Sequence, residues 1–156
     1  MKKIAFSLCA FVLACSVEMA RAQQTAKAAA AAPQAQTGRL LVTILTGSED
    51  PYRVGWGLRI ALNAFTHPYG EKQLDNVCVL LFSRGVTIVD PKTPYFNEFR
   101  QRLEALRKAG VEVVACVSGL QELGLEKEAE ALGIKTVHAS VYVSTRTSEG
   151  YTIMTF

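Results

Sequence analysis

The chain has 156 residues, of which 49% are hydrophobic and 20% charged, a composition typical of a globular protein with room for one domain and a substantial core. Its formal net charge is +3, but three of the 17 basic and one of the 14 acidic residues lie within residues 1–22, so the remainder carries only +1. This near-neutral balance excludes an electrostatic argument for nucleic acid or an anionic membrane as partner.

Residues 1–22 have the three parts of a secretory signal peptide. Lys2 and Lys3 form the charged start, residues 4–17 form an apolar stretch too short to span a bilayer, and Ala20-Arg21-Ala22 fits the cleavage pattern of small residues. We therefore predict export to the periplasm, a mature chain that starts at Gln23, and no membrane span.

Two other interpretations of this leader stay open. One is an uncleaved anchor or an amino-terminal helix. The other is a lipid anchor on Cys15, because Val12-Leu13-Ala14-Cys15 partly fits a lipoprotein box. After the leader, residues 23–38 are rich in Ala and Gln and have no apolar periodicity, so they predict a flexible tether before a domain over residues 39–156.

Strand-like and helix-like segments alternate along residues 39–156. Continuous apolar or alternating runs predict strands at residues 40–45, 77–82, 111–116, 134–138 and 151–156. Helical spacing of apolar residues predicts helices from Pro51 after an Asp50 cap, from Pro94 after a Thr93 cap to Gly110, and over residues 120–132.

Two segments need separate mention. Residues 83–86 predict a turn, and residues 140–149 are ambiguous because Val141-Tyr142-Val143 favours a strand by local propensity. The alternation as a whole predicts an α/β fold, a three-layer α/β/α domain with about five mostly parallel strands and helices on both faces.

The most informative residue is Cys116, at the end of the apolar run that starts at Val111 and just before Val117-Ser118-Gly119. A thiol there lies at the carboxyl edge of the sheet, where open α/β folds keep their ligand crevice. A helix starting just after the turn favours the reactive thiolate. The pattern predicts sulfur chemistry at Cys116. The alternative is a small apolar residue that completes a strand.

Four cysteines are present, and Cys9 and Cys15 lie in the leader. Cys78 is in the middle of a strand-like run, where core packing is the better prediction. An oxidising compartment permits a disulfide, but neighbouring strands rarely offer the geometry. We therefore expect two free thiols, Cys78 buried and Cys116 accessible; a redox pair of Cys78 and Cys116 is the alternative.

Five polar residues are candidates for the crevice beside Cys116. Ser48, Asp50 and Arg53 follow the first strand, Arg84 follows the second, and Ser118 follows the third. Arg84 is the best candidate for a cation that supports a thiolate or an anionic sulfur species. For the loop residues Ser48, Asp50 and Arg53, capping and solvation are an equally good interpretation.

Other motifs predict no cofactor. Gly55-Trp56-Gly57 begins like a dinucleotide fingerprint, but Ile60 occupies the position of the third glycine. His67 and His138 show no metal-binding spacing, so no metal site is expected.

The order of four segments resembles the DsrE/DsrF-like family, which includes the YchN-like proteins. These segments are residues 41–53 (LVTILTGSEDPYR), residues 79–86 (VLLFSRGV), the cysteine strand preceded by residues 106–110 (LRKAG), and the closing strand that ends in Thr155-Phe156. The resemblance covers residues 39–156. It implies a parallel five-stranded α/β/α domain, a homo-oligomer, and a helix over residues 140–149.

The resemblance also implies a function. Better understood members pass sulfur as a cysteine persulfide in sulfur oxidation or tRNA thiolation, and Cys116 matches the sulfur-accepting position. This chain departs from the family at Gln121-Glu122-Leu123-Gly124, where an Arg-Gly pair is common, so one cation is missing. It departs again in its leader, because the characterised relays are cytoplasmic.

We therefore expect an exported sulfur carrier or sulfurtransferase-type protein, whose partner is a donor or acceptor protein or a small sulfur species. The alternative is a non-catalytic oligomeric module of the same fold that holds a small ligand or a protein in the same crevice.

Overall fold

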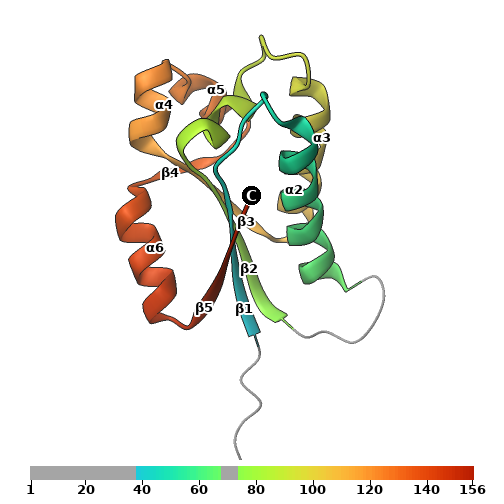
Figure 1. Ribbon diagram of the computed structural model, residues 1–156, viewed down its shortest axis with the longest axis vertical. Coiled ribbons are helices and arrows are strands. Elements are labelled where there is room, and N and C mark those ends of the chain that lie inside the picture. The colour runs from blue at the N-terminus through green and yellow to red at the C-terminus, as the bar shows by residue number, and fades with distance from the viewer. Residues whose placement is uncertain (1–37, 68–73) are drawn as a thin grey trace, which may run out of the picture. The chain divides into compact units, whose positions relative to one another are not determined.

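The computed structural model describes residues 38–67 and 74–156, in which strands and helices alternate (Figure 1). The predicted signal peptide and all but the last residue of the predicted tether lie outside these ranges. The elements in chain order are β1 (Gly38–Ile44), α2 (Pro51–Thr66), β2 (Leu74–Leu81), the 3-10 helix η1 (Ser83–Val89), α3 (Phe96–Ala109), β3 (Glu112–Cys116), α4 (Val117–Leu123), α5 (Glu126–Ala131), β4 (Lys135–Val137), α6 (Ala139–Ser148) and β5 (Tyr151–Thr155).

The five strands form one sheet in the order β4-β3-β2-β1-β5, and every neighbouring pair is parallel. The central strands β1, β2 and β3 are continuous apolar runs because both of their faces are covered. Leu41, Val42, Val79 and Val114 are fully buried. The predicted parallel α/β fold class is confirmed.

The register separates the two faces of the sheet. Leu41 lies beside Cys78, and Cys78 lies beside Glu112, so all three share one face. The other face carries Val42 and Val79.

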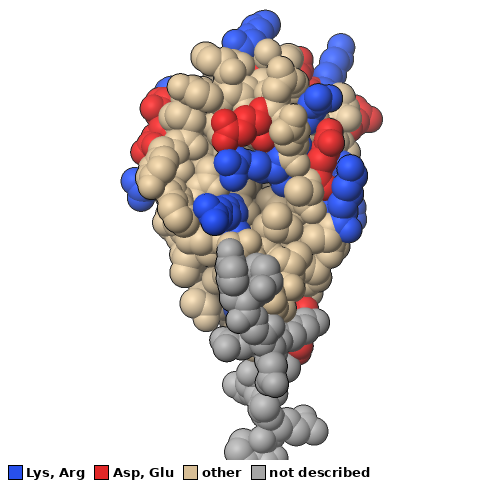
Figure 2. Space-filling view, turned by 90° about the vertical axis from the view of Figure 1, so that its right-hand side faces the viewer, with Lys and Arg blue, Asp and Glu red and all other residues tan. Residues whose placement is uncertain are grey.

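Helices cover each face. The second face packs against α2, where Gly57 approaches the Ile44 side chain, whereas α6 reaches the Glu112 face through Tyr142. Figure 1 shows α2 and α3 on one side of the sheet and α4, α5 and α6 on the other, which confirms the three layers. Lys, Arg, Asp and Glu side chains intermingle on the α2–α3 side (Figure 2). Within α3, the Arg102 guanidinium pairs with the Glu98 carboxylate at 2.8 Å.

The first residues of α2 and α3 can be compared with the predicted helix caps. Asp50 accepts a 3.0 Å hydrogen bond from the N–H of Arg53, and Pro51 is the first residue of α2, as predicted. The predicted start at Pro94 is wrong, because α3 begins at Phe96. The Thr93 hydroxyl bonds back to the Asp90 carbonyl oxygen at 3.0 Å, so it closes a turn and caps no helix.

The single helix predicted over residues 120–132 is also wrong. Two helices, α4 and α5, occupy this stretch, and Gly124 ends the first with a left-handed φ of +65°. The N–H of Gly124 bonds the Gln121 carbonyl oxygen and the N–H of Leu125 bonds that of Leu120, a pairing that closes a helix. Glycine adopts this conformation without a steric penalty, so it acts as a stop and not as an interior residue.

Two further segments differ from local propensity. The turn predicted at residues 83–86 is the start of η1, which continues to Val89. Of the ambiguous residues 140–149, all but Glu149 are helical in α6, as the resemblance implied, and this helix contacts β5 of the sheet. None of the helices in the described part of the chain combines the length and apolar character needed to cross a membrane.

Candidate functional site

Cys116 is the last residue of β3, pairs with Val137 of β4, and directly precedes α4. The thiol therefore lies at the carboxyl edge of the sheet, where the sequence places it. The expectation of an accessible thiol is wrong at the level of the whole residue, because Cys116 is only 4% exposed. The physical reason is that it is enclosed at this edge by the segments on either side, Phe82 after β2 and the first turn of α6.

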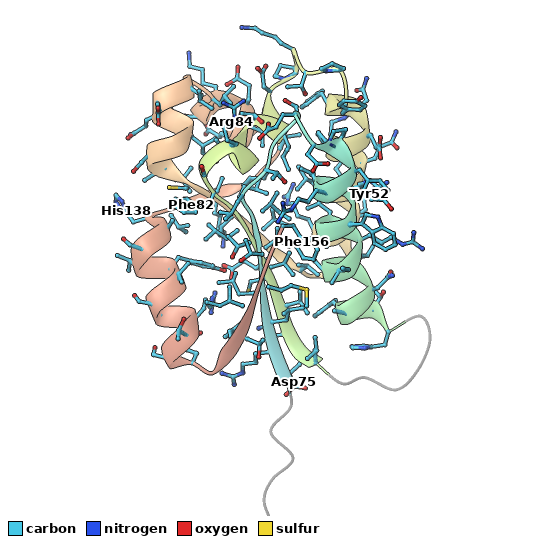
Figure 3. All side chains as sticks on the ribbon, viewed as in Figure 1. Tyr52, Asp75, Phe82, Arg84, His138 and Phe156 are labelled. Atoms are coloured by element: carbon cyan, nitrogen blue, oxygen red, sulfur yellow. The ribbon has the colours of Figure 1, made fainter. Side chains whose placement is uncertain are left out.

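The remaining exposed part of Cys116 faces a pocket of about 420 Å³. This volume falls within the range of small-molecule sites. Figure 3 shows Phe82 and His138 between α4 and α6, where this pocket opens. The pocket is lined by Phe82, Cys116, Ser118, His138, Ala139, Ser140 and Val143. We call it the cysteine pocket.

The lining of the cysteine pocket is mostly apolar among the described residues. Its lining includes the Phe82 ring and the aliphatic side chains of Ala139 and Val143, and it holds no Lys, Arg, Asp or Glu side chain. His138 and Cys116 are its titratable groups, and His138 lies at the exposed rim. The arrangement suits a nucleophilic thiol at the inner wall of a small-molecule site.

Of the five predicted crevice residues, Ser118 lines the cysteine pocket together with Cys116. Arg84 lies well above Phe82 and His138 in Figure 3. It lines a separate hollow of about 280 Å³ with Ser83, Thr87, Gly119, Glu122 and Leu123. The Arg84 guanidinium pairs with the Glu49 carboxylate at 3.5 Å. Both side chains are exposed, so we expect this ion pair to be weak.

Ser48, Asp50 and Arg53 do not line the cysteine pocket either. The Ser48 N–H donates a 3.2 Å hydrogen bond to the Thr87 hydroxyl, and the Asp50 carboxylate caps α2. Arg53 is exposed in the first turn of that helix. The structure therefore gives Ser48 and Asp50 local structural partners and leaves Arg53 facing solvent.

A second polar cluster lies on the same face of the sheet, toward the amino ends of the strands, and the sequence analysis missed it. Glu112 is its centre: Oε2 accepts hydrogen bonds from the Tyr142 hydroxyl at 2.8 Å and from Arg146 at 2.5 Å. The Cys78 thiol lies 3.5 Å from the same oxygen and 3.8 Å from the Tyr151 hydroxyl. We call these five residues the Glu112 cluster. Tyr142 and Arg146 are four residues apart and share a helix face, a signal that becomes visible once residues 140–149 are taken as helical.

The Glu112 cluster shifts the ionisation of its members. Burial raises the pKa of the Cys78 thiol, against the hydrogen bonds of Tyr142 and Tyr151 and the charge of Arg146. Partial burial opposes ionisation of Glu112, but Tyr142, Arg146 and Cys78 outweigh it and lower the pKa of its carboxyl. Burial, with the neighbouring Cys78, raises the pKa of Tyr151 to about 12. Cys78 is thus a buried, protonated thiol, and its predicted place in the core is confirmed at 1% exposure.

The two thiols are too far apart to form a disulfide. Cys78 pairs with Glu112, four residues before Cys116 on β3, which separates the two cysteines by about 13 Å along the strands. A disulfide needs Cα atoms within about 7 Å. Both cysteines are free, so the alternative of a directly bonded redox pair is wrong. Within residues 38–67 and 74–156, no three His, Cys, Asp or Glu side chains are grouped to hold a metal ion.

Comparisons with known proteins give the family and the fold. The model of the DsrE/DsrF-like family matches residues 24–156. A conserved protein of unknown function from Bacteroides thetaiotaomicron, BT1422, has a similar structure with a TM-score of 0.62 and 13% identity, over 79% of this chain and 98% of that one.

A second protein of unknown function, MTH1491 from Methanobacterium thermoautotrophicum, gives a TM-score of 0.56 and 20% identity, over 76% of this chain and 99% of that one. At these identities the likeness concerns the fold alone. No curated protein gave a significant match.

Proposed function

The chain belongs to the DsrE/DsrF-like family, and we propose that it is a sulfur carrier that holds sulfur as a persulfide on Cys116. One observation carries the proposal: the thiol at the carboxyl end of β3 lines a pocket of about 420 Å³. A carrier needs a thiol that a donor molecule can reach and that the fold then shields, and a pocket wall meets both needs.

The chemistry is thiol exchange at sulfur. The Cys116 thiolate attacks the sulfane sulfur of a donor, a new S–S bond forms at Sγ, the donor's own S–S bond breaks, and the donor leaves as a thiolate. An acceptor thiolate then attacks the outer sulfur, and Cys116 leaves as a thiolate. The zero-valent sulfur only changes its partner, so no external oxidant or reductant is consumed.

We further propose that this carrier works in the periplasm and assembles as a homo-oligomer. The leader sequence of residues 1–22 supports export, and the mass of the mature amino terminus distinguishes cleavage at Ala22 from lipid attachment at Cys15. On the edge strand β5, Ile153 and Met154 are 42% and 41% exposed, which supports a contact with another chain. Light scattering on the purified protein measures the assembly.

A second candidate function has an observation in its favour. Cys116 is only 4% exposed, and no Lys or Arg side chain lines its pocket among the described residues, so local support for a thiolate is weak. A non-catalytic module that binds a small ligand or a protein segment fits these facts. Ligand binding that persists in Cys116→Ser, without sulfur transfer by the native protein, favours this second function.

The test is sulfur loading followed by mass spectrometry. The reduced full-length protein is incubated with inorganic polysulfide, or with an organic trisulfide plus cysteine, and then desalted and weighed intact. Trypsin separates the two thiols, because Cys116 lies on the peptide of residues 109–127 and Cys78 on that of residues 73–84. We expect a gain of one or more sulfur atoms on the first peptide.

Two variants make the result specific. Cys116→Ser is expected to abolish the gain, and Cys78→Ser is the matched thiol control that keeps it. Loss of the added sulfur on exposure to an acceptor thiol establishes transfer. A native protein that gains no sulfur at Cys116 from either donor overturns the proposed function.

A further inference from the structure

The charge of the cysteine pocket bears on which donors it takes. Its seven lining residues in the described part of the chain include no Lys, Arg, Asp or Glu. Phe82 is 39% exposed, a large fraction for an aromatic ring, and its ring lines the pocket with Val143 and Ala139. Exposed aromatic and aliphatic surface in a concave site is the usual contact for the apolar part of a ligand.

The cation that the sequence predicts for this crevice, Arg84, does not line the cysteine pocket. Arg84 lines the separate hollow beside α4, and its guanidinium is 3.5 Å from the Glu49 carboxylate. Burial opposes ionisation of the Glu49 carboxyl, but hydrogen bonds from the backbone of Glu49 and Gly47 and the charge of Arg84 outweigh it and lower the pKa of this carboxyl. Arg84 therefore has an acidic partner of its own outside the cysteine pocket.

We propose that the cysteine pocket selects uncharged sulfane-sulfur compounds with an aliphatic or aromatic substituent, such as organic trisulfides, over anionic donors such as thiosulfate. This inference rests on the proposed function and adds its substrate class. An anion that enters the pocket loses hydration and meets no Lys or Arg side chain in exchange, because the one titratable side chain besides Cys116, His138, lies at the exposed rim. An uncharged donor loses little hydration and gains contact with Phe82 and Val143.

With a trisulfide, R–S–S–S–R, as the donor, one small thiol is needed to complete the formation of the persulfide. The Cys116 thiolate attacks the central sulfur, one outer S–S bond breaks, and R–S⁻ leaves and takes a proton from water. Cys116 then carries –S–S–R. A thiolate R′–S⁻ attacks the sulfur that bears R, and R–S–S–R′ leaves, so that Cys116 keeps one extra sulfur as a persulfide.

The experiment compares donors in the folded and the unfolded protein. The reduced full-length protein reacts with dimethyl trisulfide or with thiosulfate at equal concentration, in buffer and in concentrated urea. The rate of modification of the peptide with residues 109–127 is measured for each. The ratio of the trisulfide rate to the thiosulfate rate in urea gives the intrinsic preference of the same thiol for the two donors. We expect folding to raise the trisulfide-to-thiosulfate ratio by about tenfold or more, because only the folded pocket excludes the anion.

A charge introduced at the pocket is the second readout. Ser140 is exposed, lies in the first turn of α6 and lines the pocket, so a longer side chain there is compatible with folding. Ser140→Lys is expected to lower the ratio toward the value in urea, whereas Ser140→Met, of similar length and uncharged, is expected to keep it.

The outcomes separate the two proposals. A folded protein that loads from both donors with the ratio found in urea, or that prefers thiosulfate, overturns the selectivity and leaves the sulfur carrier in place. A folded protein that loads from neither donor overturns the selectivity, and it overturns the sulfur carrier as well if inorganic polysulfide also adds no sulfur at Cys116. A ratio that Ser140→Lys and Ser140→Met change equally also overturns the selectivity by charge.

Discussion

The Tyr142 hydroxyl donates a 2.8 Å hydrogen bond to Oε2 of Glu112 and so joins α6 to the first residue of β3. The same helix supplies Ala139, Ser140 and Val143, which lie on either side of Tyr142 in the sequence, to the cysteine pocket. Within α6 only Ala139 is buried, and Tyr142 and Val143 are half-buried against the core, so the apolar contact of this helix is small. The Glu112 cluster is therefore a polar anchor for one wall of the pocket.

Tyr142→Phe removes one hydrogen bond of that anchor and keeps the ring that lies under Arg146 at 4.8 Å. A hydrogen bond to a charged group contributes about 1.5–3 kcal/mol, and Arg146 continues to hold Glu112, so we expect a loss of about 1–2 kcal/mol in the free energy of unfolding. Urea denaturation measures it. Tyr95→Phe is the control, because the Tyr95 ring is exposed and packs on Phe99. Equal stability of Tyr142→Phe and the native protein contradicts the anchor.

Glu112→Gln tests the charge of the same anchor through pH. The pKa of Glu112 is lowered in the folded protein, so its contribution to stability is present above the unfolded value of about 4.5 and is lost as the pH falls through the folded value. We expect the variant to be less stable than the native protein at pH 7 and the difference to shrink below about pH 4.5. Thermal melts from pH 7 to pH 3 measure this. Glu130→Gln, at an exposed position on α5, controls for the loss of a negative charge, and a difference that stays constant with pH argues against the assignment.

Most of the fold follows from local sequence signals. Apolar runs with both faces buried are typical of parallel strands, and β1, β2 and β3 agree with them. The start of α2 was predictable because Asp50 and Pro51 act on their own helix. The start of α3 was not, because Thr93 has two possible partners, the helix N–H groups and the Asp90 carbonyl oxygen, and tertiary context selects the second.

The candidate site was predictable in part. The position of Cys116 at the end of a strand predicted that its thiol lies at the edge of the sheet. Ser118, two residues later, was predicted to lie beside it and lines the same pocket. The partner of Arg84 was not predictable, because Glu49 and Arg84 meet only when the loops after β1 and β2 fold side by side. The Glu112 cluster was missed for a similar reason, because its members come from β2, β3, α6 and β5. In addition, tertiary packing makes α6 a helix although its local sequence favours a strand.

Gly85→Ala is expected to destabilise the protein strongly. A Cβ atom at Gly85 would collide with the carbonyl oxygen of Ile44, at the end of β1, and a backbone atom within a sheet moves little. Overpacking of this kind costs about 1–3 kcal/mol, and the rigid partner puts Gly85→Ala at the upper end. Gly119→Ala is the matched control, because its Cβ would meet the Val86 side chain at 3.4 Å, an ordinary contact, and alanine favours α4. Urea denaturation that ranks Gly119→Ala below Gly85→Ala in stability contradicts this close approach.

Alkylation rates distinguish the two thiols. Cys78 is 1% exposed and burial raises the pKa of its thiol, so its thiolate is scarce in the folded protein. Cys116 lines an open pocket large enough for iodoacetamide. We expect the peptide of residues 109–127 to react at least about tenfold faster than that of residues 73–84 at pH 8, and the two rates to converge in urea. Phe82→Ala removes a pocket wall and is expected to speed Cys116 alone, because Cys78 lies in the separate Glu112 cluster. Faster labelling of Cys78 than of Cys116 in the folded protein would reverse the assignment of the reactive thiol.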